Sequence, residues 1–577
     1  MREMRKLKRP SILSSADSYK LSHADQLVEN TEMIYENFTP RSLKYLNKKY
    51  RNLPKDKLVV FGLQQTIQQL VEAFDEDFFS QDFDVAVSRF AKQSKFFTSG
   101  RYNVNRLREL HELGFLPLKV KTLKEGTLVS PRIPLLTIRN THGQKYAWVL
   151  GFLETYISNE TWKKFTNATI AFSYRLLLEQ AARETVGHDT SFVLFQAHDF
   201  SARGMSGSHD ASQSSVAHLA SFLGSDSVGA TSVAIDYYGC GEDEFIASSI
   251  CASEHMTETL AIQYFAKKLG VSLQEAEYHQ MKRYITEVYP SGIVARVSDS
   301  YDYWNVITNI VPRLKEEILN RPVDEMGLSK VVIRPDSGDP VDIICGEAIP
   351  VRTITDIERL ARSYKEGDSF WVSNTKNPNG VWNTYYIRID VKPEGLEQTF
   401  FLNKDVPPEV KGTVECLWET FGGTMTQKGY RLLDSHIGMI YGDSITINRA
   451  EDIVNRLKEK GFASTNTALG IGSYTYQYST RDTTGSAIKA TYAVVDGIGI
   501  DLNKDPKTDD GTKKSAKGLL RVEFDENGEY VLLEQQTPEQ EEGGELKTIF
   551  EDGVFTPHST LASIREEINK SVEKYLG

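Results

Sequence analysis

The sequence predicts an α/β fold, in which an irregular β/α barrel is joined to a mostly β domain built from both ends of the chain. Through the middle of the chain, apolar runs that end in polar residues alternate with helical stretches, as in a parallel sheet. Near both termini, apolar and polar residues instead alternate between Gly and Pro, as antiparallel strands do. The two sequence patterns therefore predict two domains of different architecture.

The β-rich domain is predicted over residues 1–150 and 486–577, and the barrel domain over 151–485. The stretch "LPLKVKTLKEGTLVSPRIPLLTIRNT" (116–141) shows the alternation, and "LLRVEFDENGEYVLLE" repeats it near the C-terminus. A β-rich insertion is predicted within the barrel at about 341–430. In it, "WVSNTKNPNGVWNTYYIRI" has the pattern of a β-hairpin around a turn-forming Asn-Pro-Asn-Gly.

Several predicted barrel strands end in polar residues. In "VVIRPDSGDP" (331–340), three β-branched residues are followed by Arg334, Pro335 and Asp336. One such ending is typical of a turn. Ligands of parallel sheets bind beyond the carboxyl ends of the strands, so repeated endings predict a site. The other endings are "SFVLFQAHDFSARG" (191–204), "GIVARVSDS" (292–300), "GMIYGDS" (438–444) and "TALGIGSYT" (467–475).

The helices between these strands carry their own boundary signals. In "NRAEDIVNRLKEKG" (448–461), Asn448 and Glu451 resemble a capping box, and Gly461 suits the position after a helix. We therefore expect a helix between the fourth and fifth of these strand endings.

The residues at the strand ends suit phosphate and ribose ligands. Asp299, Asp336 and Asp443 supply oxygen atoms for a magnesium–phosphate site or for ribose hydroxyls. Arg334 and Arg481 can each bind phosphate through two hydrogen bonds. The small residues of "GIGS" allow backbone N–H groups to approach an anion. Any single aspartate among these would more simply cap a helix.

Composition and missing motifs exclude several classes. The 577 residues carry a formal charge of −12, which argues against a general nucleic-acid binder. No apolar stretch is long enough to cross a membrane, and the basic N-terminus is not followed by the apolar run of a secretion signal. The four cysteines form no C-x-x-C pair, which favours a reducing cytoplasm. P-loop, G-x-G-x-x-G and H-E-x-x-H motifs are absent.

Ten short motifs follow one another in an order that resembles a known family. They are "DSYKLSH" (17–23), "FGLQQ" (61–65), "HDFSARG" (198–204), "GSDSV" (224–228), "SEH" (253–255), "VSDSYD" (297–302), "IRPDSGDP" (333–340), "GDS" (442–444), "STRD" (479–482) and "NKDP" (503–506). This order resembles the nicotinamide phosphoribosyltransferases, which are type II phosphoribosyltransferases. The resemblance extends over nearly the whole chain except the insertion.

The resemblance implies an activity and an assembly. The implied reaction joins nicotinamide to phosphoribosyl pyrophosphate, giving nicotinamide mononucleotide and pyrophosphate with Mg²⁺. It also implies that ATP hydrolysis assists the reaction through a phosphohistidine, and that two active sites form at the interface of a homodimer. Mg²⁺ is expected to bind mainly through pyrophosphate, with Asp299 as the candidate protein ligand.

The resemblance also assigns roles to individual residues. Phe200 and the partner's Tyr19 would sandwich the pyridine ring, while Arg203 and Asp226 would hold its carboxamide. Asp336 would face the ring and ribose, Arg334 the phosphate, and Asp443, beside Gly442, the ribose hydroxyls. Gly472, Ser473 and Arg481 would bind the 5′-phosphate. Asp299, Arg41, Lys504 and Lys513 would serve pyrophosphate and ATP, and His255 would be the phosphorylated histidine.

Two departures and three alternatives accompany this assignment. The glycine-rich loop, "GSGGG" in animal members of the family, here reads "GIGSY", and Ala295 replaces the first serine of "SVVSDS". A nicotinate phosphoribosyltransferase shares the fold and chemistry, and Asp226 is the residue that discriminates. A barrel aldolase would need a Schiff-base lysine at a strand end, which these endings lack. A non-catalytic binding protein would have little need for Arg334, Asp336, Asp443 and His255 together.

Overall fold

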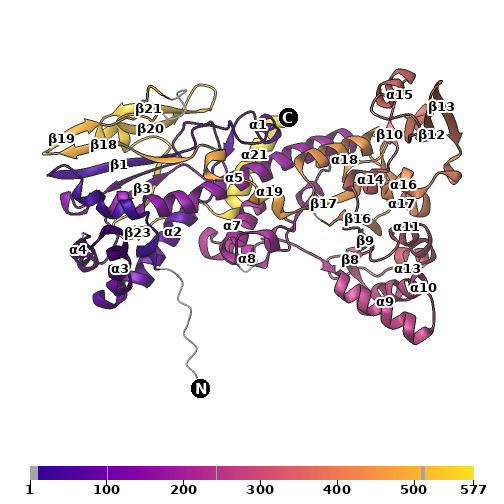
Figure 1. Ribbon diagram of the computed structural model, residues 1–577, viewed down its shortest axis with the longest axis horizontal. Helices are drawn as coiled ribbons and strands as arrows, with labels where there is room; N and C mark the ends of the chain where they lie inside the picture. The colour runs from indigo at the N-terminus through magenta and orange to yellow at the C-terminus, as the bar shows by residue number, and fades with distance from the viewer. Residues whose placement is uncertain (1–10, 101, 242, 443, 509–513) are drawn as a thin grey trace.

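The computed structural model describes residues 11–100, 102–241, 243–442, 444–508 and 514–577. Figure 1 shows an elongated molecule with an antiparallel sheet at one end and a parallel sheet toward the other. The long helix α5 (Val149–Thr185) runs between them. At about 1.5 Å per residue, its 37 residues span roughly 55 Å. No helix in these ranges is long and apolar enough to cross a membrane.

The antiparallel sheet combines strands from both ends of the chain. Strand β1 (Thr31–Thr39) pairs with β18 (Ala487–Val495) on one side and with β5 (Leu136–Asn140) on the other. The sheet continues with β3 (Leu118–Thr122), β22 (Lys547–Glu551) and β23 (Val554–Phe555) at one edge and β19 (Ile498–Asp501) at the other. Smaller pairs are β2 (Leu58–Val59) with β4 (Leu128–Val129), and β20 (Leu519–Phe524) with β21 (Tyr530–Gln536).

The parallel sheet forms a curled half-barrel. Its order is β6-β17-β16-β9-β8-β7, and every neighbouring pair is parallel. Short bridges from Asp199 to Ser225 and from Gly224 to Ser248 extend it beyond β6. The predicted fold class is therefore confirmed. The strands are β6 (Ala197–Asp199), β7 (Cys251–Ala252), β8 (Gly292–Val297), β9 (Ser329–Arg334), β16 (Ile437–Tyr441) and β17 (Thr467–Ile471).

Helices cover both units. Those of the N-terminal part are α1 (Lys48–Asn52), α2 (Leu63–Phe74), α3 (Phe83–Thr98) and α4 (Asn105–Leu113). Those around the half-barrel are α6 (Val193–Gln196), α7 (Ser208–Leu219), α8 (Val228–Tyr238), α9 (His255–Leu269), α10 (Leu273–Arg283), α11 (Tyr303–Asn305), α12 (Val311–Arg313), α13 (Lys315–Leu319), α14 (Pro340–Cys345), α18 (Ile447–Glu459) and α19 (Ser473–Gln477). Near the C-terminus lie α20 (Pro538–Glu541) and α21 (Leu561–Leu576), the latter packed on α5.

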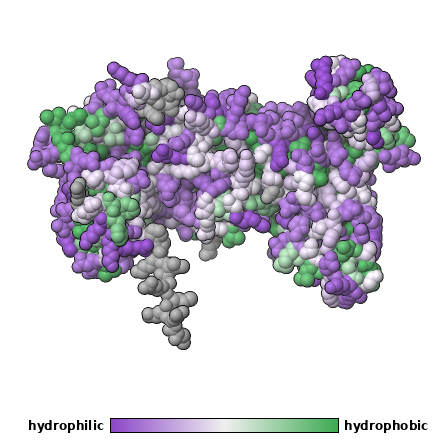
Figure 2. Space-filling model, in the orientation of Figure 1, coloured by the Kyte–Doolittle hydropathy of each residue, from purple (hydrophilic) through white to green (hydrophobic). Residues whose placement is uncertain are grey.

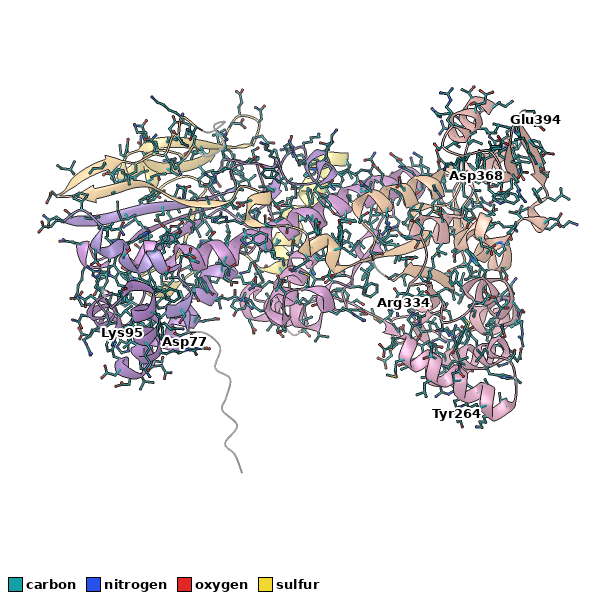
Figure 3. All side chains as sticks on the ribbon, viewed as in Figure 1. Asp77, Lys95, Tyr264, Arg334, Asp368 and Glu394 are labelled. Atoms are coloured by element: carbon teal, nitrogen blue, oxygen red, sulfur yellow. The ribbon has the colours of Figure 1, made fainter. Side chains whose placement is uncertain are left out.

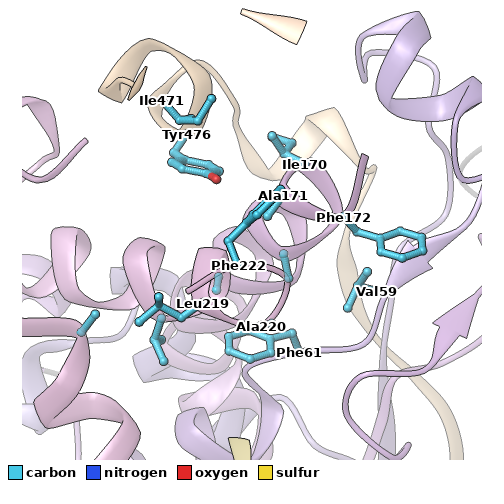
Figure 4. Packing of buried hydrophobic residues seen from close by; sticks show 14 of the residues in the cluster. Val59, Phe61, Ile170, Ala171, Phe172, Leu219, Ala220, Phe222, Ile471 and Tyr476 are labelled. Carbon is cyan, nitrogen blue, oxygen red and sulfur yellow. The ribbon is translucent and has the colours of Figure 1, made fainter. Parts of the chain in front are cut away.

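One apolar core joins the two units. It includes Val59 and Phe61 near β2, Phe172 on α5, Leu219 on α7 and Tyr476 on α19, all fully buried (Figure 4). Because helix α5 contributes side chains along its length to this core, it fixes the antiparallel sheet and the half-barrel in one body. The predicted boundary near residue 150 falls at the start of this shared helix, and the domain limits stay a prediction.

The inserted region forms a separate lobe with a small core of its own. Strands β11 (Ser369–Lys376) and β12 (Asn383–Lys392) form the predicted hairpin, flanked by β10 (Ile349–Pro350) and β13 (Gly395–Phe401). Its surface is mainly hydrophilic in Figure 2. Helix α15 (Ile354–Ala361) covers it. By contrast, α17 (Thr413–Phe421), which follows the short α16 (Pro408–Lys411), packs in the main core. After it, β14 (Gly423–Met425) pairs with β15 (Arg431–Leu433).

The predicted N-cap of α18, Asn448, is wrong by two residues. The helix begins at Ile447, and the hydroxyl of Thr446 accepts the hydrogen bond from the N–H of Arg449, so Asn448 lies inside the helix. Threonine and asparagine are both favoured N-cap residues, and the sequence has both here. Gly461 does follow the helix in a left-handed conformation, with φ of +78°. The C-terminal prediction is confirmed.

Candidate active site

The ends of β8 and β9 bring two aspartates together. The Oδ2 atom of Asp299 accepts hydrogen bonds from the backbone N–H of Asp336 (2.9 Å) and the hydroxyl of Ser337 (2.6 Å). The side chain of Asp299 is only 4% exposed. Its Oδ1 atom is buried and has no hydrogen-bond partner in the part of the chain that the structure describes. Because buried carboxylate oxygens are normally paired, this atom is available to a ligand or a neighbouring cation.

His255 occupies the first position of α9 and faces this free oxygen. Its Nε2 atom lies 3.6 Å from Oδ1 of Asp299, and its Nδ1 atom lies 3.3 Å from the hydroxyl of Ser300. The imidazole is 46% exposed. It therefore sits between a helix N-terminus, which favours negative charge, and a carboxylate that can orient the ring.

Arg334 ends β9 with part of its guanidinium unused. Its Nη2 atom donates to the carbonyl of Ser253 (3.0 Å), and its buried Nε atom has no partner among the described residues. Figure 3 shows Arg334 on the side of the parallel-sheet unit that faces the middle of the molecule. The fixed guanidinium can bind an anionic group, as a phosphate site requires.

The end of β6 supplies an aromatic surface and a second carboxylate. Phe200 packs on a small apolar cluster of Ala295, Val332 and Ile440 inside the half-barrel. The Nε2 atom of His198 lies 2.8 Å from Oδ1 of Asp226. Although partial burial opposes ionisation, hydrogen bonds from His198 and Ser249 and the nearby Arg334 hold the pKa of Asp226 below its usual value.

At three glycines in the site, an added Cβ atom would force a neighbouring atom to shift. A Cβ atom at residue 442 would lie 1.9 Å from Oδ1 of Asp336, and one at residue 204 would lie 2.1 Å from the hydroxyl of Ser473. A Cβ at residue 470 would lie 2.4 Å from the carbonyl oxygen of Gly442. These glycines let the ends of β9, β16 and β17 meet the turn after β6. Of the three, only Gly470 belongs to "GIGSY", and the effect of that loop's departure from "GSGGG" stays a prediction.

The residues assigned to the 5′-phosphate follow β17. Gly472 precedes α19 and Ser473 begins it, while Arg203 lies in a short turn, Ala202–Gly204, that contacts the same helix. Arg481 is 56% exposed and pairs only loosely with Asp482, at 3.4 Å. Gly472 and Ser473 thus directly follow a strand of the parallel sheet, whereas Arg481 lies in a separate short turn, Arg481–Thr483, that contacts α5.

A second group of predicted residues lies on the antiparallel sheet. Arg41 lines a cavity of about 110 Å³ together with Arg132, Lys489 and Lys514. Burial lowers the pKa of Lys489, and the neighbouring Arg41 and Lys504 lower it further, although Glu154 and Glu36 oppose them. Several cations so close together favour the binding of a polyanion in this cavity. Tyr19 is 59% exposed on a short helix, Ser18–Asp25, that packs on α3 and α5.

Comparison with known proteins identifies the family. Residues 195–553 match the family model for the nicotinate phosphoribosyltransferase (NAPRTase) family. The chain belongs to this family. It is 42% identical to the nicotinamide phosphoribosyltransferase of Acinetobacter baylyi, over 98% of each chain. It is 30% identical to the nicotinamide phosphoribosyltransferase of Mycoplasma pneumoniae, over 88% of this chain and 94% of the relative.

The family relationship extends to the fold. A nicotinate-nucleotide pyrophosphorylase from Pyrococcus furiosus superposes with a TM-score of 0.51 over 100% of this chain and 99% of the other. At 13% identity, this likeness concerns the fold alone. The resemblance predicted from the ten motifs is confirmed.

Some assignments to this family's site lie beyond what the structure describes. Asp443 and Lys513 are outside the described residues, so their placement stays a prediction. Within the described ranges, no group of three or more His, Cys, Asp and Glu side chains could hold a metal ion.

Sequence reasoning assigned no role to three polar residues that contact the predicted site residues. His198 and Ser249 hold Asp226, and the buried Ser253 accepts from Arg334. Each stands in or beside a strand ending, which was the available signal. Asp199, which ends the same run as His198, is fully buried and accepts from the N–H of Ser201 and the hydroxyl of Ser225. It has a structural role.

Proposed function

We propose that this chain transfers the phosphoribosyl group of phosphoribosyl pyrophosphate to nicotinamide. The products are nicotinamide mononucleotide and pyrophosphate, as in NAD salvage. The observation that carries the proposal is the convergence of Asp226, Arg334, Asp336, Asp299 and His255 at one edge of the parallel sheet. The relatives' names, nicotinamide phosphoribosyltransferase, support the choice of base.

The chemistry needs positioning more than acid–base catalysis. The pyridine nitrogen is already a nucleophile, and bond breaking at C1 of the ribose gives an oxocarbenium-like state. Phe200 offers a ring face to the pyridine, and Asp226 an acceptor to its amide group. Asp336 would stabilise positive charge on the ribose, while Arg334 would hold phosphate. Orientation and electrostatics of this kind supply much of an enzyme's rate enhancement.

The carboxylates fit a metal ion that is held mainly by the substrate. The buried, unpaired Oδ1 atom of Asp299 is an oxygen ligand of the kind Mg²⁺ prefers. When bound there, Mg²⁺ would stabilise the charge of the departing pyrophosphate. Asp299 would hold the ion from one side, and the hydrogen bonds from Asp336 and Ser337 would fix its other oxygen.

We further propose that ATP assists the reaction through phosphorylation of His255. The half-exposed imidazole at the start of α9 can accept a phosphoryl group, and the helix N-terminus favours the added charge by about 0.3–1 kcal/mol. Asp299 is placed to orient the ring. His255→Ala should abolish ATP hydrolysis and leave only slow product formation, measured as phosphate release and product per minute. Unchanged ATP hydrolysis would refute this role.

A homodimer with shared sites would unite the two groups of residues. In Figure 1 the helix α3, against which the segment with Tyr19 packs, lies far from β8 and β9. The basic cavity with Arg41 also lies on the antiparallel sheet. A second copy would bring Tyr19, Arg41 and Lys504 to the strand ends.

The four cysteines are free thiols, which fits a cytoplasmic protein.

Product identification tests the proposed reaction. Purified protein should convert nicotinamide and phosphoribosyl pyrophosphate, with Mg²⁺, into a compound of the mass of nicotinamide mononucleotide. Asp336→Ala should remove that product, which excludes a contaminating activity. Absence of the product from the wild-type protein, or its persistence in the variant, would contradict the proposal.

A further inference from the structure

A buried cluster of three charged residues, Arg296, Glu258 and Glu277, lies beneath the helix that carries His255. Arg296 projects from β8, Glu258 from the first turn of α9, and Glu277 from α10. Their side chains are at most 1% exposed. The Nη2 atom of Arg296 lies 2.9 Å from Oε2 of Glu258 and 3.2 Å from Oε1 of Glu277, and its Nε atom donates to the same Glu258 oxygen.

This cluster is a poor choice for stability alone. Burying three charges costs solvation free energy, and apolar residues of similar volume often serve as well. Moreover, Oε1 of Glu258 and Nη1 of Arg296 have no hydrogen-bond partner among the residues that the structure places. The cluster can instead fix the orientation of the elements that carry it, because a guanidinium group binds carboxylates in a fixed geometry.

The cluster fixes the position of His255 relative to Asp299. Glu258 follows His255 by three residues, so both lie on the same side of α9. Arg296 precedes Asp299 by three residues at the end of β8. A second connection runs through Ser253, whose hydroxyl accepts from the N–H of Val297 and whose own N–H donates to the carbonyl of Ala295. The imidazole and the carboxylate are thus joined through one rigid link.

We infer that Arg296, Glu258 and Glu277 form a positioning clamp, which holds the His255 imidazole against Asp299 for phosphoryl transfer. The inference rests on the proposed function, in which His255 carries the phosphate. None of the three residues touches the reacting atoms. They act through α9, whose N-terminus they hold at the end of β8. In Figure 1, α9 and α10 lie side by side below β8.

An apolar replacement of the whole clamp tests this role without leaving a charge buried. In Glu258→Leu/Arg296→Met/Glu277→Leu, kcat for ATP hydrolysis should fall on the order of 10- to 100-fold, because a displacement of about 1 Å costs that much. The KM for ATP should change little, and product formation without ATP should persist. Arg296→Lys keeps the cation but not the fork, and should lie between wild type and the triple variant.

A matched control separates positioning from general stability. Lys460 and Glu415 form another buried ion pair of the same domain, 2.7 Å apart and at most 4% exposed. Lys460→Met/Glu415→Leu should keep kcat for ATP hydrolysis near the wild-type value, even if its melting temperature falls. Equal losses in both variants, or a triple variant that hydrolyses ATP at the wild-type rate, would overturn the inference.

A crystal structure of the triple variant gives a readout that does not depend on activity. The distance between Nε2 of His255 and Oδ1 of Asp299, 3.6 Å here, should lengthen. An unchanged distance would overturn the clamp, whatever the hydrolysis assay shows. By contrast, ATP hydrolysis that survives His255→Ala would overturn the phosphohistidine and not the clamp geometry.

Discussion

The imidazole Nε2 of His198 lies 2.8 Å from the carboxylate Oδ1 of Asp226, at the point where β6 ends. The contact orients one carboxylate oxygen toward the histidine. Because the pKa of Asp226 is held below its usual value, this carboxyl group is ionised near neutral pH. We therefore expect a fixed negative charge at this position, which would favour an amide over an acid in the bound base.

Asp226→Ser should change the base selectivity. An ionised Asp226 accepts from the –NH₂ of nicotinamide and repels the carboxylate of nicotinate. A hydrogen bond to a charged group contributes about 1.5–3 kcal/mol, and the half-exposed position favours the lower end. The ratio of kcat/KM for nicotinamide over nicotinate should therefore fall about 10-fold or more. Steady-state kinetics with each base measure the ratio, and a ratio equal to that of the wild type would remove Asp226 from selectivity.

Gly442→Ala should disturb Asp336. The new methyl group would lie 1.9 Å from Oδ1 of Asp336, so the carboxylate must move. We expect kcat/KM to fall about 10- to 100-fold. Gly438→Ala in the same strand is the matched control, since its methyl group would meet the flexible side chain of Lys330 at 3.2 Å. Similar kinetics for the two variants would show that the approach of Gly442 to Asp336 is unimportant.

Two inactive variants should complement each other if sites are shared between subunits. Mixing Tyr19→Ala with Asp336→Ala gives mixed dimers in which one site has both wild-type residues. Activity should recover toward roughly a quarter of the wild-type level at full exchange, because half of the dimers are mixed and each has one intact site. Subunit exchange is followed with differently tagged chains. No recovery after proven exchange would contradict the shared site.

The inserted lobe should be removable if the cut respects the main core. The N–H of Glu347 donates to the carbonyl of Glu409 at 2.9 Å, so a short linker can replace residues 350–406. A longer deletion, 350–425, would remove α17 from the core and is the wrong design. Catalysis should remain, with lower stability, because Glu415 loses its hydrogen bond from Tyr386 (2.6 Å).

Tyr386→Phe is the control for that deletion, since it removes only the hydroxyl group. Thermal unfolding should show a loss of about 1 kcal/mol or more for this variant. A folded deletion variant without any activity would show that the lobe contributes to the site or to the dimer.

Strand ends were predictable because their signal is local. Val331 to Ile333 followed by Arg334 and Asp336 indicated a buried strand and its end, and β9 (Ser329–Arg334) includes that run but begins two residues earlier. For β1 and β18, the sequence showed only that both ends of the chain have alternating apolar and polar residues. It did not predict their pairing, because the register depends on residues about 450 positions apart.

The features that the sequence did not predict depend on contacts between residues that are distant in the sequence. Arg296 stands in an apolar run, and nothing near it indicates that Glu258 and Glu277 will neutralise it in the interior. The 2.8 Å contact of His198 with Asp226 likewise joins strand β6 to a segment 28 residues further along the chain. At α18, two residues that can cap a helix, Thr446 and Asn448, lie two positions apart, and the local sequence does not distinguish them; the structure has Thr446 as the cap.

A competition experiment tests the central claim most directly. Wild-type protein is given equal concentrations of nicotinamide and nicotinate with limiting phosphoribosyl pyrophosphate and Mg²⁺, and the two mononucleotides are counted by mass spectrometry. The account predicts nicotinamide mononucleotide in at least about 10-fold excess, from one charged hydrogen bond at Asp226. Nicotinate mononucleotide as the main product, or neither product, would contradict it.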